Sequence, residues 1–107
     1  MKDSTYERIR RFNDDRDWAQ FHSPENLAKS IAIEAAELLE LFQWDADAAK
    51  EDIRDELADV LIYALDMAHA CGLDPDTIVN QKLDKNEAKY PADKARGSSK
   101  KYTELHE

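Results

Sequence analysis

Residues that break helices or form cross-links are scarce in this chain. It holds two glycines, three prolines and a single cysteine, Cys71, among 107 residues. One cysteine excludes an internal disulfide and favours a reducing compartment. Because 36% of the residues are charged and glycine and proline are few, the composition favours helices joined by short connections. The length suits one domain, and the small core of such a domain makes oligomerisation a reasonable expectation.

Basic charge and long apolar runs are scarce as well. The chain has 15 Lys and Arg against 24 Asp and Glu, a formal net charge of −9. Residues 91–107 hold four basic and three acidic side chains, +1, so residues 1–90 carry −10 (−9 minus +1). Such an acidic body does not bind nucleic acid, and it repels a phosphorylated ligand unless cations intervene. Since no signal peptide or run of 18 apolar residues is visible, we expect a soluble, cytoplasmic protein without a membrane partner.

Capping and stop signals predict four helices, with expected bounds Ser4–Asp15, Ser23–Gln43, Ala49–Ala70 and Asp74–Tyr90. Ser4 with Glu7 has the spacing of a capping box. Ser23 is a good N-cap because Pro24 follows at the first helical position. Gly72 is a typical C-terminal stop for the third helix. No strand pattern stands out, so the sequence predicts an all-α protein.

The four helices predict an antiparallel four-helix bundle over residues 1–90. Residues 91–107 are polar and basic, and we expect them to form an arm without a core of its own. The second helix has a wider apolar arc than one short chain can cover. We therefore expect assembly into a dimer or a tetramer.

Carboxylates stand inside the apolar stripes of the second and third helices. At about 100° per residue, Glu34 falls in the middle of one stripe and Glu37 on its shoulder, about 60° away. Glu56 and Asp59 repeat this arrangement on the third helix. Glu40 lies farther round, towards solvent. Each of these two helices therefore has one acid in the middle of its apolar stripe and a second acid on the same edge of the stripe.

An unpaired carboxylate in a core costs several kcal/mol or takes up a proton. A buried ion pair is the ordinary cause of such a pattern, but Lys29 and Arg54 lie on other sides of their helices. Packing the two stripes together gathers four carboxylates, which repel one another unless cations are bound. Oxygen ligands suit Mg²⁺ or Mn²⁺ before zinc. We interpret these four acids as a metal cage; Glu40 is a solvated charge unless it contacts a second ion.

The spacing Glu34-x-x-Glu37, then 18 residues, then Glu56-x-x-Asp59 resembles the metal signature of the MazG-like nucleoside triphosphate pyrophosphohydrolases. Further segments resemble the dCTP pyrophosphatase branch of this family: 16–27, 37–44, 55–63, 86–91 and 95–105. The resemblance implies an all-α fold that assembles, with sites near subunit boundaries. It implies cleavage of a nucleoside triphosphate substrate between its α and β phosphates, giving the monophosphate and pyrophosphate. Mg²⁺ would be held by the four acids, and Glu37 or Glu40 would orient the attacking water.

The candidates for substrate contact are Trp18, His22, Trp44, Tyr63, Lys82, Asn86 and Lys89. In the dCTP branch the tryptophans that match Trp18 and Trp44 line the base pocket, and the residue that matches Asn86 recognises base or sugar. Each tryptophan could equally serve ordinary packing. His22 either caps backbone groups or contacts the ligand. Tyr63 lies beside Glu56 on the third helix, within reach of sugar or phosphate. The lysines form a stripe that suits either solvent or phosphate oxygens.

Three alternatives compete with a dCTP-cleaving pyrophosphohydrolase. A carboxylate-bridged di-iron bundle needs Glu-x-x-His on two helices, and the chain has Glu37 and Asp59 at the two histidine positions. A helical interaction module with a regulatory Mg²⁺ or Ca²⁺ site stays open, as does a dUTP-cleaving relative with a similar bundle. Release of pyrophosphate from a deoxynucleoside triphosphate separates an enzyme from an interaction module.

Overall fold

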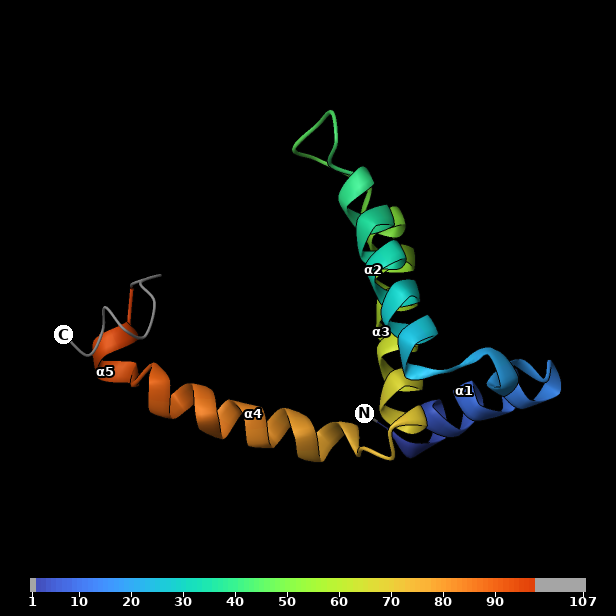
Figure 1. Cartoon of the computed structure of the whole chain (residues 1–107). Coiled ribbons are helices and arrows are strands. Elements are labelled where there is room, and N and C mark those ends of the chain that lie inside the picture. Colours follow the sequence, from blue (N-terminus) through green and yellow to red (C-terminus); the bar gives the residue numbers. More distant parts are fainter. Residues whose placement is uncertain (1, 98–107) are drawn as a thin grey trace. The chain divides into compact units, whose positions relative to one another are not determined.

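A computed structural model describes residues 2–97 of the chain, which form helices and connecting loops (Figure 1). The elements are α1 (Asp3–Asp15), the short 3-10 helix η1 (Trp18–Phe21), α2 (Pro24–Glu40), α3 (Lys50–Ala70), α4 (Pro75–Lys89) and α5 (Ala92–Ala95). Residues 2–97 contain no strand, so the prediction of an all-α protein is confirmed. None of these helices is long and apolar enough to cross a membrane. The chain divides into two compact units, Met1–Asp74 and Pro75–Glu107.

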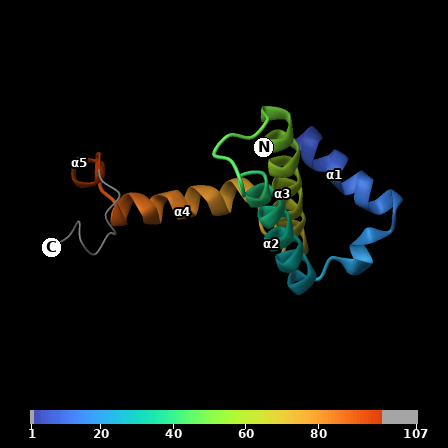
Figure 2. The same ribbon diagram turned by 90° about the horizontal axis from the view of Figure 1, so that it is seen from above.

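The first unit is built on α2 and α3, which lie side by side and run antiparallel (Figures 1 and 2). Leu27 of α2 is its most deeply buried apolar side chain, 1% exposed, and Leu65 and Ala68 of α3 are also buried. The start of α2 is as predicted: the hydroxyl of Ser23 accepts a hydrogen bond from the Asn26 N–H at 3.2 Å. This cap fixes where the helix begins, and hence which side chains face α3.

The C-terminal ends of α2 and α3 each have a local cause. After Glu40 the next three N–H groups bond three residues back, to Leu38, Leu39 and Glu40, so α2 tightens and stops before the expected Gln43. At the far end of α3, Gly72 adopts φ 67°. The Leu73 N–H donates to the Ala68 carbonyl at 2.8 Å. This is the Schellman arrangement that glycine favours, and it confirms the predicted stop.

Helix α1 packs against α3 through a buried acid. Asp66, 3% exposed, accepts hydrogen bonds from Arg10 and from Asn13, both at 2.8 Å. The predicted capping box at the start of this helix is wrong. The helix begins at Asp3 with Lys2 as its N-cap, and no side chain caps it. Ser4 therefore lies inside the first turn, where its hydroxyl is not at the capping position.

The second unit contains α4 and α5 and ends beyond the described residues. Ile78, Val79, Leu83 and Asn86 belong to the lining of one groove on α4, of about 330 Å³. Asn86 thus shares the apolar face of its helix, as the periodicity predicted. Part of the expected arm forms the short helix α5, and the rest of the arm, residues 98–107, lies outside the described residues.

Candidate metal and nucleotide site

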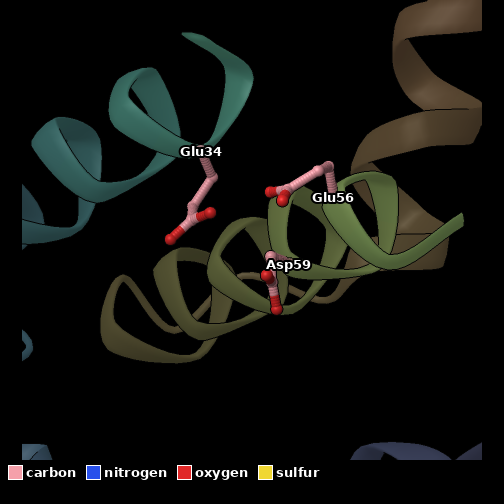
Figure 3. Close-up of side chains that lie close together, drawn as sticks. All are labelled: Glu34, Glu56 and Asp59. Carbon is pink, nitrogen blue, oxygen red and sulfur yellow. The ribbon is translucent and has the colours of Figure 1, made fainter. Parts of the chain in front are cut away.

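Three carboxylates meet across the α2–α3 hairpin. Glu34 comes from α2, and Glu56 and Asp59 come from α3, three residues apart and hence on one side of that helix. One carboxylate oxygen from each lies within 4.8 Å of the others. Figure 3 shows the three side chains extending into the same space. The structure thus brings together three of the four acids that the sequence pattern singled out.

Two of these acids hold oxygens that nothing in the described chain satisfies. The Oε2 atoms of Glu34 and Glu56 are buried without a hydrogen-bond partner. Burial, a hydrogen bond with Glu37 and the charges of Glu37, Asp59 and Glu56 raise the pKa of Glu34 to about 7. Burial is also the first cause that raises the pKa of Glu56, followed by a hydrogen bond with Glu37 and the charges of neighbouring acids. Buried oxygens that repel one another are the setting a cation stabilises.

Glu37 and Glu40 take different places around this cluster. Glu37 helps to raise the pKa of both Glu34 and Glu56, but it is not one of the three acids within 4.8 Å of one another. Its side chain is exposed. Glu40 is exposed too and lines a different cavity with Leu39 and Gln43. Of the two predicted water-orienting acids, Glu37 is therefore the one beside the cluster.

Lys29 of α2 and Arg54 of α3 do not pair with the cluster. Lys29 pairs with Glu25 at 3.2 Å, and Arg54 pairs with Asp55 at 3.8 Å, as expected from their position on other sides of their helices. The donor set is made of carboxylate oxygens, which suits a hard divalent cation. The unsatisfied buried oxygens, and the pairing of Lys29 and Arg54 with other acids, both fit a metal site.

A cavity of about 350 Å³ opens next to the acids. Its lining is Trp18, Phe21, His22, Asn26, Leu27, Ser30 and Tyr63. Ser30 lies four residues before Glu34, and Tyr63 lies four residues after Asp59, so each is one helical turn from the cluster. Burial and the charges of Glu34 and Asp59 raise the pKa of the Tyr63 hydroxyl. An aromatic-lined cavity and an acidic cluster thus share the same stretch of hairpin.

Of the predicted substrate contacts, this cavity gathers Trp18, His22 and Tyr63. Trp44 is 90% exposed and follows the other end of α2. At 1.5 Å per residue, Glu40 lies about 15 Å along the helix from Ser30, so Trp44 of the same chain is remote from this cavity. Lys82, Asn86 and Lys89 belong to α4 of the second unit. Their contact with substrate stays a prediction.

Three residues of the lining, Phe21, Asn26 and Ser30, were not predicted from the sequence. Phe21 ends the 3-10 turn, and its carbonyl accepts a hydrogen bond from the Asn26 amide at 3.0 Å. The position of Ser30 near the site could have been predicted, because a residue four positions before the metal-binding candidate Glu34 lies on the same side of the helix. The position of Phe21 could not, since it depends on the path of the chain between α1 and α2.

Comparison with known proteins identifies the family of the chain. The model of the MazG-like family matches residues 29–105, which include all four candidate metal ligands. Human dCTP pyrophosphatase 1 is 44% identical, over 94% of this chain and 68% of its own length. Its rat counterpart is 42% identical over the same shares. The crystal structure of a pyrophosphatase from Archaeoglobus fulgidus superposes with a TM-score of 0.77 at 41% identity, covering 82% of this chain and 90% of that chain. The chain belongs to the MazG-like family.

Proposed function

We propose that this protein is a nucleoside triphosphate pyrophosphohydrolase that converts a deoxynucleoside triphosphate to its monophosphate and pyrophosphate. The observation that carries the proposal is the acidic cluster of Glu34, Glu56 and Asp59, within 4.8 Å, next to the cavity lined by Trp18 and Tyr63. The substrate proposal, dCTP or a close relative, is supported by relatives of over 40% identity named dCTP pyrophosphatase 1. Such an activity serves to clear or balance the nucleotide pool of the cytoplasm.

The cofactor we propose is Mg²⁺, with Mn²⁺ as a substitute. Glu34, Glu56 and Asp59 would hold it, and Glu37 is the proposed fourth ligand. When bound, the metal neutralises the triphosphate, polarises the α-phosphate and lowers the pKa of the attacking water. The unsatisfied buried oxygens of Glu34 and Glu56 support this assignment, because a cation replaces the partners they lack.

The chain's own residues divide the remaining work. Glu37, exposed and close enough to raise the pKa of Glu34, is the residue we propose to orient the attacking water; Glu40 is the alternative. Trp18 stacks on the base, and His22 contacts it from the same cavity. The Tyr63 hydroxyl, between cavity and acids, hydrogen-bonds sugar or phosphate.

The helix α4 supplies the remaining proposed contacts. Lys82 and Lys89 meet phosphate oxygens, and Asn86 reads the edge of the base. Lys82 and Asn86 line the same groove on α4, which supports a shared role. The catalytic domain is then residues 1–90, including α4, and residues 91–107 are an appended arm.

The working form we propose is an antiparallel four-helix bundle assembled as a dimer or tetramer. Large apolar side chains of the α2–α3 hairpin are exposed in the single chain, among them Ile33 at 59%, Leu39 at 71% and Leu61 at 50%. A second copy of the chain would cover these side chains. Trp44, 90% exposed, would then reach a base cavity from the partner subunit, since it is remote from the cavity of its own chain. A monomeric mass by light scattering at micromolar concentration contradicts this assembly.

Product analysis tests the proposed reaction. The protein is incubated with each of the four canonical deoxynucleoside triphosphates, with dUTP and with modified cytosine triphosphates, in Mg²⁺, and the products are separated by ion exchange. We expect monophosphate and pyrophosphate, with dCTP or a close relative among the better substrates. Glu56→Gln is the matched inactive control. Orthophosphate and diphosphate as the main products, or no turnover of any triphosphate, contradict the proposal; preference for dUTP moves it to the dUTP-cleaving alternative.

A further inference from the structure

The Trp18 side chain packs against the last turn of α1. Its ring meets the ring of Phe12 edge to face, with centroids 5.4 Å apart and an interplanar angle of 77°. The guanidinium carbon of Arg16 lies over the Phe12 ring, 3.8 Å from its centroid. Arg16 is itself fixed, because its Nη1 donates to the Phe12 carbonyl at 3.1 Å. We call these three residues the Arg16–Phe12–Trp18 stack.

The turn that enters η1 sets the direction of this stack. Asp17 adopts the left-handed conformation, φ 52° and ψ 38°, which is uncommon outside glycine. The Gln20 side chain donates to both the carbonyl and the carboxylate of Asp17, at 2.9 and 3.0 Å. The unusual conformation is thus held by two hydrogen bonds at the residue just before Trp18. Such over-determined turns are found at functional sites.

Phe12 supports the cavity without lining it. It lines a separate groove of about 300 Å³ with Ile9 of α1 and Ile62 of α3, whereas Trp18 lines the cavity beside the acids. Two residues along α1 from Phe12, Arg10 is hydrogen-bonded to Asp66 of α3. Trp18 is therefore connected to α3, the helix of Tyr63, through Phe12 and α1. A substrate in the cavity would contact Trp18 and not Phe12 or Arg16, because neither residue belongs to the lining.

We propose that Phe12 and Arg16 are positioning residues that hold Trp18 at the angle needed to stack on the substrate base. The proposal rests on the proposed function in one respect, that Trp18 contacts the base. An indole freed from its support samples other rotamers, and each binding event must order it again. The acidic cluster on α2 and α3 is not part of the stack, so loss of the stack weakens binding and spares the chemical step.

Phe12→Ala tests the proposal, and Ile9→Ala is its matched control. Both variants lose apolar packing in the same groove, but only Phe12→Ala removes the ring that contacts Trp18. We expect Phe12→Ala to raise KM for all four deoxynucleoside triphosphates by a similar factor, about three- to tenfold, the size of an aromatic pair contact, with kcat within about twofold. Phe12→Tyr should restore the wild-type KM. Equal KM in Phe12→Ala and Ile9→Ala overturns the proposal.

Fluorescence gives a readout that is independent of turnover. The chain has two tryptophans, so in a Trp44→Phe background the tryptophan emission, excited where tyrosine does not absorb, comes from Trp18 alone. Trp44 is 90% exposed, and its replacement leaves the packing of the unit intact. Phe12→Ala in this background should shift the emission to longer wavelength and lower its anisotropy, whereas Ile9→Ala should do neither. Unchanged emission in Phe12→Ala overturns the proposal even if activity falls.

If Phe12→Ala fails to fold, Arg16→Met is the variant that tests the proposal. It removes the guanidinium over the ring and the hydrogen bond to the Phe12 carbonyl, at an exposed position after α1. Its effects on KM and on Trp18 emission should have the same direction and be smaller. No effect of Arg16→Met on either quantity overturns its part in the stack. If the wild-type protein itself releases no pyrophosphate, the proposed function fails, while the fluorescence experiment still decides whether the stack holds Trp18.

Discussion

Arg10 of α1 donates a hydrogen bond to Asp66 of α3 at 2.8 Å, across 56 residues of sequence. The Asn13 amide donates to the same carboxylate oxygen, also at 2.8 Å. The Asp66 side chain is 2% exposed and that of Arg10 is 20% exposed, so the ion pair is largely removed from water. The Arg10 guanidinium also lies 5.2 Å from the centre of the Tyr6 ring. This network fixes α1, and with it the entry to η1, on the α2–α3 hairpin.

Removing the acid of this network should destabilise the first unit. Asp66→Ala leaves the Arg10 charge and the Asn13 amide without their shared acceptor. Breaking a buried pair costs about 3–5 kcal/mol, and the partial exposure of Arg10 brings the expected loss to about 2–3 kcal/mol. Urea unfolding monitored by circular dichroism measures it. The control is Asp55→Ala, whose pair with Arg54 is exposed and should contribute under about 0.5 kcal/mol. Equal losses in the two variants contradict the prediction.

Stability without metal should fall as pH rises. The pKa of Glu34 is raised from 4.5 to about 7, so the folded state holds this proton more tightly than the unfolded state. This contribution is fully present below about pH 4.5 and is lost as pH rises through about 7. Glu56 is shifted in the same direction. In a chelator, the free energy of unfolding of the wild type should therefore fall between pH 5 and pH 8.

Mg²⁺ should reverse that loss at pH 8, because it binds the folded state and not the unfolded chain. Urea unfolding at both pH values, with chelator and with Mg²⁺, measures the effect. In Glu34→Gln the change between pH 5 and pH 8 should be smaller, since the group that titrates is gone. An equal change in the wild type and in Glu34→Gln shows that other groups cause it, and the assignment to Glu34 is then wrong.

Glu56→Gln should separate the metal role of this residue from a structural one. The amide removes one negative charge from the cluster while keeping the shape of the side chain. Without metal at pH 8 the variant should be more stable than the wild type, because repulsion among the acids is relieved. It should gain little stability from Mg²⁺ and should lose turnover. Glu51→Gln, an exposed acid in the first turn of α3, serves as control. Full turnover and unchanged metal affinity in Glu56→Gln contradict the cage assignment.

Helical periodicity predicted the centre of the site because its cause is local. Glu34 and Glu56 lie in apolar stripes, and each stripe must pack against another, so both acids are expected at the interface of an antiparallel α2–α3 hairpin. Ser23 and Gly72 fixed helix ends for equally local reasons. The role of Asp66 could not be predicted in this way. From the sequence it resembles a surface charge, because its partners, Arg10 and Asn13, are brought to it only by the tertiary fold. No short-range pattern contains that contact.

The wall of the cavity was less predictable for a related reason. Trp18 enters it because Asp17 adopts a left-handed conformation, which the sequence around it does not specify, since aspartate adopts it only occasionally. Trp44 was predicted beside Trp18 by resemblance alone. The length of α2 separates the two side chains within one chain, and this separation follows from 1.5 Å per residue once the helix is known. The proposed base site with both tryptophans would therefore take Trp44 from a second copy of the chain.

Replacing Trp18 and replacing Asn86 should have different effects on KM and on base selectivity. Stacking tolerates any base, so Trp18→Ala should raise KM for all deoxynucleoside triphosphates by a similar factor, about ten- to a hundredfold for about 1–3 kcal/mol lost. Hydrogen-bond readout discriminates between bases, because a wrong base leaves a buried amide without a partner. Asn86→Ala should therefore narrow the gap between the best and the worst base while metal binding stays intact. If the Asn86 amide only stabilises α4, the same variant lowers the melting temperature and depresses turnover of every base equally. Values of kcat/KM for the four deoxynucleoside triphosphates, together with one melting curve, decide between these two roles.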